Sequence, residues 1–241
     1  MCGIAGAFVY DSKRASLDLF YETVKASRVR GKDSFGVVEW TPSSGWFEFR
    51  RFQATIDDCI EALKAEDGAL YLHTSRAEPT TEWKKKKTER DIPPFKRGHI
   101  AVAHNGIISN DDALAKQYDI FRQSNIDTAI LPELIGRVGV WRTIRELKSG
   151  NALGIIDAEM GRLYLCRNFL PLVIAWQPGI VAFASEAKFF PGSDEPFPSF
   201  RLWVLPPFSA MEFSFKGYRG PVQWGFIPDF DENEWKPYPD F

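Results

Sequence analysis

The sequence predicts an α+β fold with two mostly antiparallel sheets, and the order of its segments is the main reason. A strand pattern comes first, helical and strand patterns then alternate, and six short strand patterns follow one another between residues 151 and 215. Successive short strands separated by Gly, Pro and Asn favour antiparallel pairing, whereas a doubly wound parallel sheet needs a helix between neighbouring strands. With 241 residues, 44% of them apolar, the chain can fill one large core.

The first quarter of the chain alternates between strand and helix patterns. Residues 2–10 form a short apolar run typical of a buried strand, and residues 16–28 carry apolar side chains at helical spacing. Two further strands are expected at residues 37–40 and 46–49, because Pro, Ser and Gly at residues 42–45 form a turn between them. This segment is predicted to be a hairpin.

The middle of the chain adds two strands and three helices, and strands alone follow. Buried strands are expected at residues 69–74 and 100–104, and helices at residues 57–65, 127–138 and 141–147. The remaining expected strands lie at residues 151–157, 162–166, 172–176, 180–184, 202–205 and 210–215.

One domain is expected over residues 2–214, followed by a C-terminal extension over residues 215–241. The extension is rich in Pro, Trp, Tyr and acidic residues, which suits a segment that wraps a surface or docks a partner. The four consecutive lysines at residues 84–87 are interpreted as a solvated surface loop.

Composition excludes several classes of function. The chain has 30 basic and 32 acidic residues, so neither nucleic acid nor an anionic membrane surface would be attracted to it. Cys2, Cys59 and Cys166 are too far apart in sequence for a metal-ligand motif or a disulfide framework. No apolar run approaches the roughly 18 residues of a membrane span, and the start lacks the basic lead-in of a secretory signal. We expect a cytoplasmic protein with no metal, no cofactor, and no membrane or nucleic-acid partner.

Cys2 follows the initiator methionine and opens the first expected strand. Removal of Met1, which a small second residue permits, would leave a thiol and a free α-amine on the same residue. The thiol has a pKa near 8.5 and needs a base to become a nucleophile. The α-amine has a pKa of about 7.7–8.0 and can be that base. Cys2 could equally be a small buried cysteine in a strand.

The tripeptide His104-Asn105-Gly106 ends the strand expected at residues 100–104. The Asn105 side-chain amide and the Gly106 backbone N–H are donors of the kind that stabilise the oxyanion in acyl transfer, each worth roughly 3 kcal/mol. Asn-Gly is also a preferred pair in tight turns, so the tripeptide alone leaves both interpretations open.

Two charged residues complete the set of candidates. Arg76 follows the strand expected at residues 69–74 and could bind a carboxylate through both arms of its guanidinium. It could also be an ordinary surface arginine. Asp127 could bind an ammonium group, or it could cap the helix expected at residues 127–138.

Taken in chain order, these segments resemble the motifs of the class II glutamine amidotransferases. The matching segments are Cys-Gly-Ile-Ala-Gly at 2–6, Arg-Gly-Lys-Asp-Ser-Phe-Gly at 30–36, His-Thr-Ser-Arg at 73–76, His-Asn-Gly-Ile-Ile-Ser-Asn at 104–110 and Asp-Thr at 127–128. Further similar segments lie at residues 91–95, 150–157, 163–168 and 183–186. Five ordered motifs over most of the chain are a far stronger signal than any one of them.

The resemblance implies a four-layer αββα sandwich, the N-terminal-nucleophile (Ntn) hydrolase fold, and a glutaminase mechanism. Cys2 would attack the side-chain amide of L-glutamine, with its own α-amine as the base. Asn105 and Gly106 would hold the oxyanion, Arg76 would bind the α-carboxylate, and Asp127 would bind the α-ammonium group. Water would then hydrolyse a γ-glutamyl thioester.

The sequence departs from the family pattern after Arg76. Residues 77–81 read Ala-Glu-Pro-Thr-Thr, where many members carry Trp-Ala-Thr-His-Gly in a loop that closes over glutamine. Ala129 stands where an acidic residue is frequent. Arg30 and Asp33 are expected to brace the first strand and to take no part in the chemistry.

Family members usually carry a second domain that uses the ammonia, whereas only about 50 residues follow the last motif here. The resemblance therefore implies a glutaminase that passes ammonia to a separate synthase. One alternative is a stand-alone hydrolase of glutamine or of another γ-glutamyl amide. Another is a domain of this fold used only for binding or regulation, and the presence of all five candidate residues argues against it.

Overall fold

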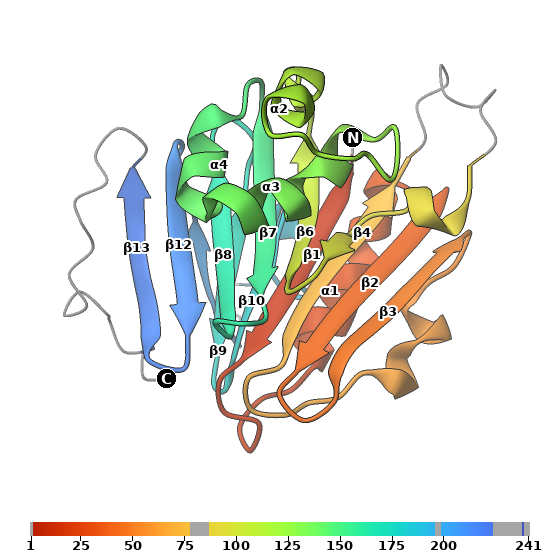
Figure 1. Ribbon diagram of the computed structural model, residues 1–241. Helices are drawn as coiled ribbons and strands as arrows, with labels where there is room; N and C mark the ends of the chain where they lie inside the picture. The colour runs from red at the N-terminus through yellow and green to blue at the C-terminus, as the bar shows by residue number, and fades with distance from the viewer. Residues whose placement is uncertain (1, 78–86, 196–198, 224–237, 239–241) are drawn as a thin grey trace.

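The structure is a computed structural model that describes residues 2–77, 87–195, 199–223 and 238. Within these residues two β-sheets stack face to face, and helices cover both outer faces (Figure 1). The expected four-layer α+β sandwich is therefore confirmed.

The first sheet holds the N-terminal strand near its centre. Its strands are β1 (Gly3–Val9), β2 (Ser34–Thr41), β3 (Gly45–Phe52), β4 (Leu70–Arg76), β9 (Val173–Gln177), β10 (Ile180–Ala184) and β11 (Arg201–Val204). Their order across the sheet is β11-β9-β10-β1-β4-β2-β3, and all of these pairings are antiparallel. β1 is thus held on one side by β4 and on the other by β10.

The second sheet is built from the middle and the end of the chain. Its strands are β5 (Phe95–Arg97), β6 (Ile100–Gly106), β7 (Asn151–Asp157), β8 (Arg162–Arg167), β12 (Ser209–Ser214) and β13 (Gly217–Gln223), in the order β13-β12-β8-β7-β6-β5. The helix α1 (Asp18–Ser27) packs on the first sheet, and α2 (Asp111–Gln117), α3 (Leu131–Val138) and α4 (Val140–Glu146) pack on the second. No helix in the described part of the chain is long and apolar enough to cross a membrane.

Buried apolar side chains form three clusters, one for each interface between layers. β1 contributes to two of them. Ala5 and Ala7 face α1, while Ile4 and Phe8 face the second sheet. Because both faces of β1 are covered, the strand reads as a continuous apolar run and does not alternate with polar residues.

The expected strands and the β2–β3 hairpin are confirmed, as are the helices that correspond to α1, α3 and α4. Three short elements, α2, β5 and β13, were not expected. In α2 only Leu114 and Ala115 are buried, and β5 has three residues. The apolar patterns of α2 and β5 are too short to be recognised from sequence, and the seven residues of β13 include two glycines and a proline, which do not read as a strand.

The helix expected at residues 57–65 is wrong, because this segment forms two 3-10 turns, Ile56–Asp58 and Ile60–Ala62. The Thr55 backbone N–H donates to the Asp58 carboxylate at 2.7 Å and starts the first turn. Cys59, with φ of −138°, then interrupts the helical path. The helix expected at residues 127–138 also begins with a 3-10 turn, Asp127–Ile130, before α3.

The segment at residues 215–241 is described only in part. β13 pairs with β12, and the Tyr238 ring stacks on Tyr10 with 4.0 Å between ring centroids. The docking role expected of this segment falls mainly on residues 224–237 and 239–241, which lie outside the described residues. Residues 78–86, with most of the loop after Arg76 and three of the four lysines, lie outside them as well.

Glu39 on β2 gives the fold a pH dependence. Its carboxyl group is 2% exposed and accepts a hydrogen bond from the Lys64 N–H at 2.7 Å. Burial raises the pKa of Glu39 from 4.5 to about 7. Between about pH 4.5 and pH 7, the native protein therefore keeps a proton on Glu39 that the unfolded chain has lost. Its free energy of unfolding should fall as the pH rises through this range.

Replacing Glu39 with Gln keeps the acceptor and removes the charge. At pH 8 we expect a Tm roughly 3–8 °C above that of the unmodified protein, and at pH 4 no difference. Thermal unfolding at the two pH values measures this. An equal change at both values would mean that the carboxyl group is not destabilised by burial.

Candidate active site

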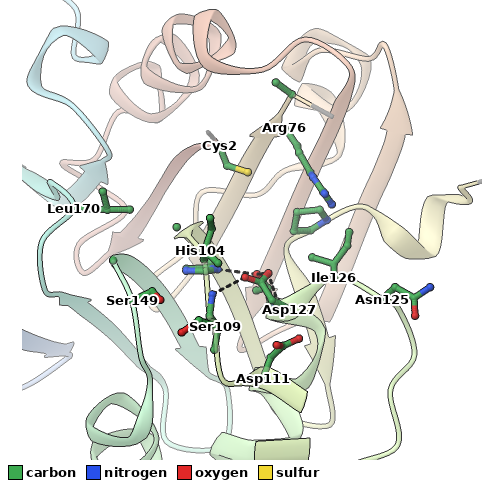
Figure 2. A pocket seen from close by; sticks show the side chains of 17 residues that line it. Cys2, Arg76, His104, Ser109, Asp111, Asn125, Ile126, Asp127, Ser149 and Leu170 are labelled. Atoms are coloured by element: carbon green, nitrogen blue, oxygen red, sulfur yellow. Dashed lines mark hydrogen bonds between the residues drawn. The ribbon is translucent and has the colours of Figure 1, made fainter. Parts of the chain in front are cut away.

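A cavity of about 760 Å³ opens where β1 begins and where β4 and β6 end (Figure 2). Four of the five candidate residues line it, namely Cys2, Arg76, Gly106 and Asp127. The fifth, Asn105, is fully buried between two lining residues. The antiparallel strands bring these residues together, although they lie up to 125 positions apart in the chain.

Cys2 is held in place by the strand that follows it. Gly3 pairs with Ser75 of β4, and the Ile4 N–H donates to the Ser185 hydroxyl at 2.8 Å. The Ser185 hydroxyl in turn donates to the Ile4 carbonyl at 3.1 Å. Sequence reasoning noted the Ala-Ser-Glu turn at residues 184–186 but gave it no role, and here it clamps the start of β1.

The Cys2 thiol is partly exposed, and its sulfur points into the space bounded by Arg76, His104 and Asp127 (Figure 2). Burial raises the pKa of the Cys2 thiol, and the positive charge of Arg76 opposes that rise. The thiol is therefore protonated at neutral pH, so a nucleophilic Cys2 needs a group that takes up its proton.

Arg76 ends β4, and its residue is only 7% exposed. Gly31 packs directly against its backbone, since a Cβ at position 31 would lie 2.3 Å from the Arg76 carbonyl carbon. The Asp33 N–H donates to the Arg76 carbonyl at 3.1 Å. Arg30 forms an ion pair with Glu186, the residue after the Ser185 clamp. The segment at residues 30–36 thus braces both Arg76 and the start of β1.

Asp127 lines the cavity, and several hydrogen bonds hold its carboxylate in place. It accepts from the Ile108 N–H at 2.7 Å, and from the Thr128 N–H at 2.6 Å and hydroxyl at 3.0 Å. The Thr128 hydroxyl also bonds to Nδ1 of His104 at 2.8 Å. Burial lowers the pKa of His104, while the charge of Asp127 opposes this. A neutral His104 thus links the end of β6 to Asp127, a connection that sequence reasoning missed.

Gly106 lines the cavity at the end of β6, and Asn105 lies buried directly before it in the strand. Among the described residues, neither the oxygen nor the nitrogen of the Asn105 amide has a hydrogen-bond partner, although the side chain is fully buried. Gly106 has a φ of +144°, and a Cβ there would lie 2.2 Å from the Gly150 carbonyl oxygen. No other residue fits at position 106. A buried amide without a partner costs about 1–3 kcal/mol unless a ligand completes it.

Two solved structures share the fold of this chain. A glutamine phosphoribosylpyrophosphate amidotransferase from B. subtilis superimposes with a TM-score of 0.70 at 19% identity, over 90% of this chain and 48% of the other. A second structure, described as the allosteric regulatory enzyme of purine biosynthesis, gives a TM-score of 0.71. The fold is that of the N-terminal-nucleophile glutamine amidotransferases.

Sequence comparison gives the same class. Residues 82–191 match the family described as glutamine amidotransferase domain. The 7-cyano-7-deazaguanine synthase of Saccharolobus solfataricus is 32% identical over 228 residues, which cover 88% of this chain and 48% of that protein. The glutamine–fructose-6-phosphate aminotransferase of Thermococcus kodakarensis is 30% identical over 79% of this chain and 33% of its own length. The chain carries a class II glutamine amidotransferase domain, and it spans half or less of the length of these relatives.

Proposed function

We propose that this chain hydrolyses the side-chain amide of glutamine through a Cys2 thioester and passes the ammonia to a synthase. The observation that carries the proposal is one cavity lined by Cys2, Arg76, Gly106 and Asp127, with Asn105 buried directly beside Gly106 in the chain. A nucleophile, an oxyanion site and two opposite charges for an amino acid are the groups that this reaction requires.

Cys2 supplies the bond-making step. With Met1 removed, the α-amine takes the thiol proton, and the sulfur attacks the amide carbon of glutamine. The carbon–nitrogen bond breaks when the amine returns the proton to the leaving nitrogen, which departs as ammonia. Water then attacks the thioester carbon, and glutamate leaves as the free thiol reforms.

Asn105 and Gly106 supply the charge stabilisation. The tetrahedral intermediate carries a negative oxygen, and we assign the Asn105 side-chain N–H and the Gly106 backbone N–H, at the end of β6, as its donors. The unpartnered Asn105 amide supports this assignment, because the bond to the intermediate satisfies a group that is otherwise buried without a partner.

We assign the acceptor from the relatives. The curated protein with 32% identity is named a 7-cyano-7-deazaguanine synthase, and this chain matches about half of it. A cyano group ends in a nitrogen atom, which ammonia can supply. The proposed acceptor is therefore a synthase of this kind. A stand-alone γ-glutamyl amide hydrolase is the second candidate, because a cavity of about 760 Å³ leaves room for a substrate larger than glutamine.

The proposal is tested by assaying ammonia release from glutamine, with glutamate as the second product, and from 4-aminobutanamide, with 4-aminobutanoate as the second product. 4-Aminobutanamide is glutamine without its α-carboxylate. The unmodified protein should strongly prefer glutamine. Replacing Arg76 with Lys removes the two-armed contact, so KM for glutamine should rise about 10–100-fold while kcat changes little.

The same replacement should leave the slow reaction of 4-aminobutanamide unchanged, because that substrate has no carboxylate for the side chain at position 76 to bind. An equal loss on both substrates would show that Arg76 has only a structural part. Absence of ammonia release from glutamine by the unmodified protein would refute the proposed function. Faster turnover of a larger γ-glutamyl amide would favour the second candidate.

A further inference from the structure

We infer that an exposed apolar surface beside the cavity is where the ammonia-accepting synthase docks, an inference that rests on the proposed function. The surface, called the mouth patch below, consists of Ile107, Phe169, Leu170 and Phe208. Ile107 and Leu170 line the cavity itself, so the mouth patch is continuous with the opening of the candidate active site.

Gly150 lies between Ile107 and the side chains of Leu170 and Phe169, and the two phenylalanine rings of the mouth patch touch. The Ile107 N–H donates to the Gly150 carbonyl at 3.2 Å. A Cβ placed on Gly150 would lie 3.6 Å from the Leu170 side chain and 4.0 Å from that of Phe169. The Phe169 and Phe208 rings meet edge to face, with centroids 4.8 Å apart.

These side chains stand on backbone that is fixed by buried polar groups. Arg167 donates to the carbonyls of Leu205 at 2.9 Å and Phe169 at 3.3 Å. Asn168 accepts from the Asn151 N–H and donates to the Ser149 carbonyl, both at 2.7 Å. Three loops, around residues 150, 168 and 206, are thus tied into one rigid platform, and a rigid surface loses little entropy on binding.

Three residues of the mouth patch leave much of their surface open to solvent. Ile107 is 66% exposed, Phe169 67% and Phe208 39%. Phe208 has a φ of +54°, in the left-handed region that bulky residues rarely occupy. Contiguous exposed apolar surface, and aromatic residues above all, mark protein–protein contacts.

The reaction proposed for the cavity indicates which partner covers the mouth patch. Ammonia that escapes into water is diluted and mostly protonated, so an acceptor that covers the mouth receives it far more efficiently. The curated relatives match this chain over less than half of their own length, and the remainder of each includes sequence that this chain does not match. An acceptor synthase seated on the mouth patch fits both facts, and a second copy of this chain fits neither.

The test compares Phe169→Ser/Phe208→Ser with the unmodified protein, using the 7-cyano-7-deazaguanine synthase of the same organism as acceptor. Glutamine or ammonium chloride is the nitrogen source. We expect glutamine hydrolysis by the double variant to stay within twofold, since neither ring lines the cavity. With glutamine, the product formed per glutamate released should fall at least fivefold. With ammonium chloride, which releases no glutamate, the rate of product formation should not change.

Met160→Ser is the matched control, because Met160 is 53% exposed and follows the far end of β7 from the cavity. It should leave coupling intact. Unchanged coupling in the double variant would overturn the inference. The inference would also fail if the double variant lost self-association of this chain while its coupling to the synthase stayed intact. Glutamine hydrolysis without any coupled product would overturn the docking inference and leave the glutaminase standing, whereas absence of hydrolysis would refute the proposed function itself.

Discussion

Replacing Cys2 with Ala should lower kcat for glutamine hydrolysis by at least about 10³-fold, because no other group in the cavity can form the thioester. The substitution removes one partly exposed sulfur, so Tm should change by only a few degrees. Release of ammonia in a coupled assay measures the loss. Activity within tenfold of the unmodified protein would eliminate the thioester mechanism.

Cys59→Ala is the matched control for this experiment. Cys59 is 5% exposed, and burial raises its pKa to about 12, so its thiol is unreactive and its loss should leave kcat unchanged. The proposed base can be tested separately with an N-terminal tag that a site-specific protease removes directly before Cys2. The tagged chain should be inactive and cleavage should restore activity, whereas full activity with the tag attached would exclude the α-amine.

Replacing Asn105 with Ala should lower kcat about 10²–10³-fold with little change in KM, because the lost donor acts on the transition state and not on bound glutamine. The Asn105 amide has no partner among the described residues of the free protein. Its removal therefore breaks no hydrogen bond there, and Tm should stay within a few degrees. Kinetics and thermal unfolding on the same preparation check both expectations.

Asn110, five residues further along, provides the contrast. Its side chain donates to the Glu146 carbonyl at 2.8 Å and accepts from the Lys148 N–H at 3.0 Å. Asn110→Ala should therefore lower Tm and leave kcat nearly unchanged. If Asn105→Ala instead lowers Tm and spares kcat, the amide is structural and the oxyanion assignment fails.

Much of the fold could be predicted from the sequence, because the strands of both sheets occur as short apolar runs separated by turn residues. β7 and β10 were expected at the residues where they occur. The failure at residues 57–65 has a local cause. A helical spacing of apolar residues was present, but Thr55 and Asp58 closed a tighter turn, and pattern alone does not reveal that competition.

The candidate site was predicted less completely than the fold. Cys2, Arg76, Gly106 and Asp127 do share one cavity, because each ends or begins an element at the same edge of the sandwich. The supporting contacts were not predictable. Ser185 reaches the Ile4 backbone across 181 residues of sequence, and no local pattern marks a hydroxyl for such a contact.

The central position of β1 also constrains when activity can appear during synthesis. The β1 segment leaves the ribosome long before β10, yet Ala5 pairs with Ala184 of β10. Until that late segment emerges, the first strand lacks one neighbour and the Ser185 clamp does not exist. Contacts so distant in sequence form slowly. The Cys2 thiol therefore gains its fixed position only when β10 and Ser185 are available to hold the start of β1.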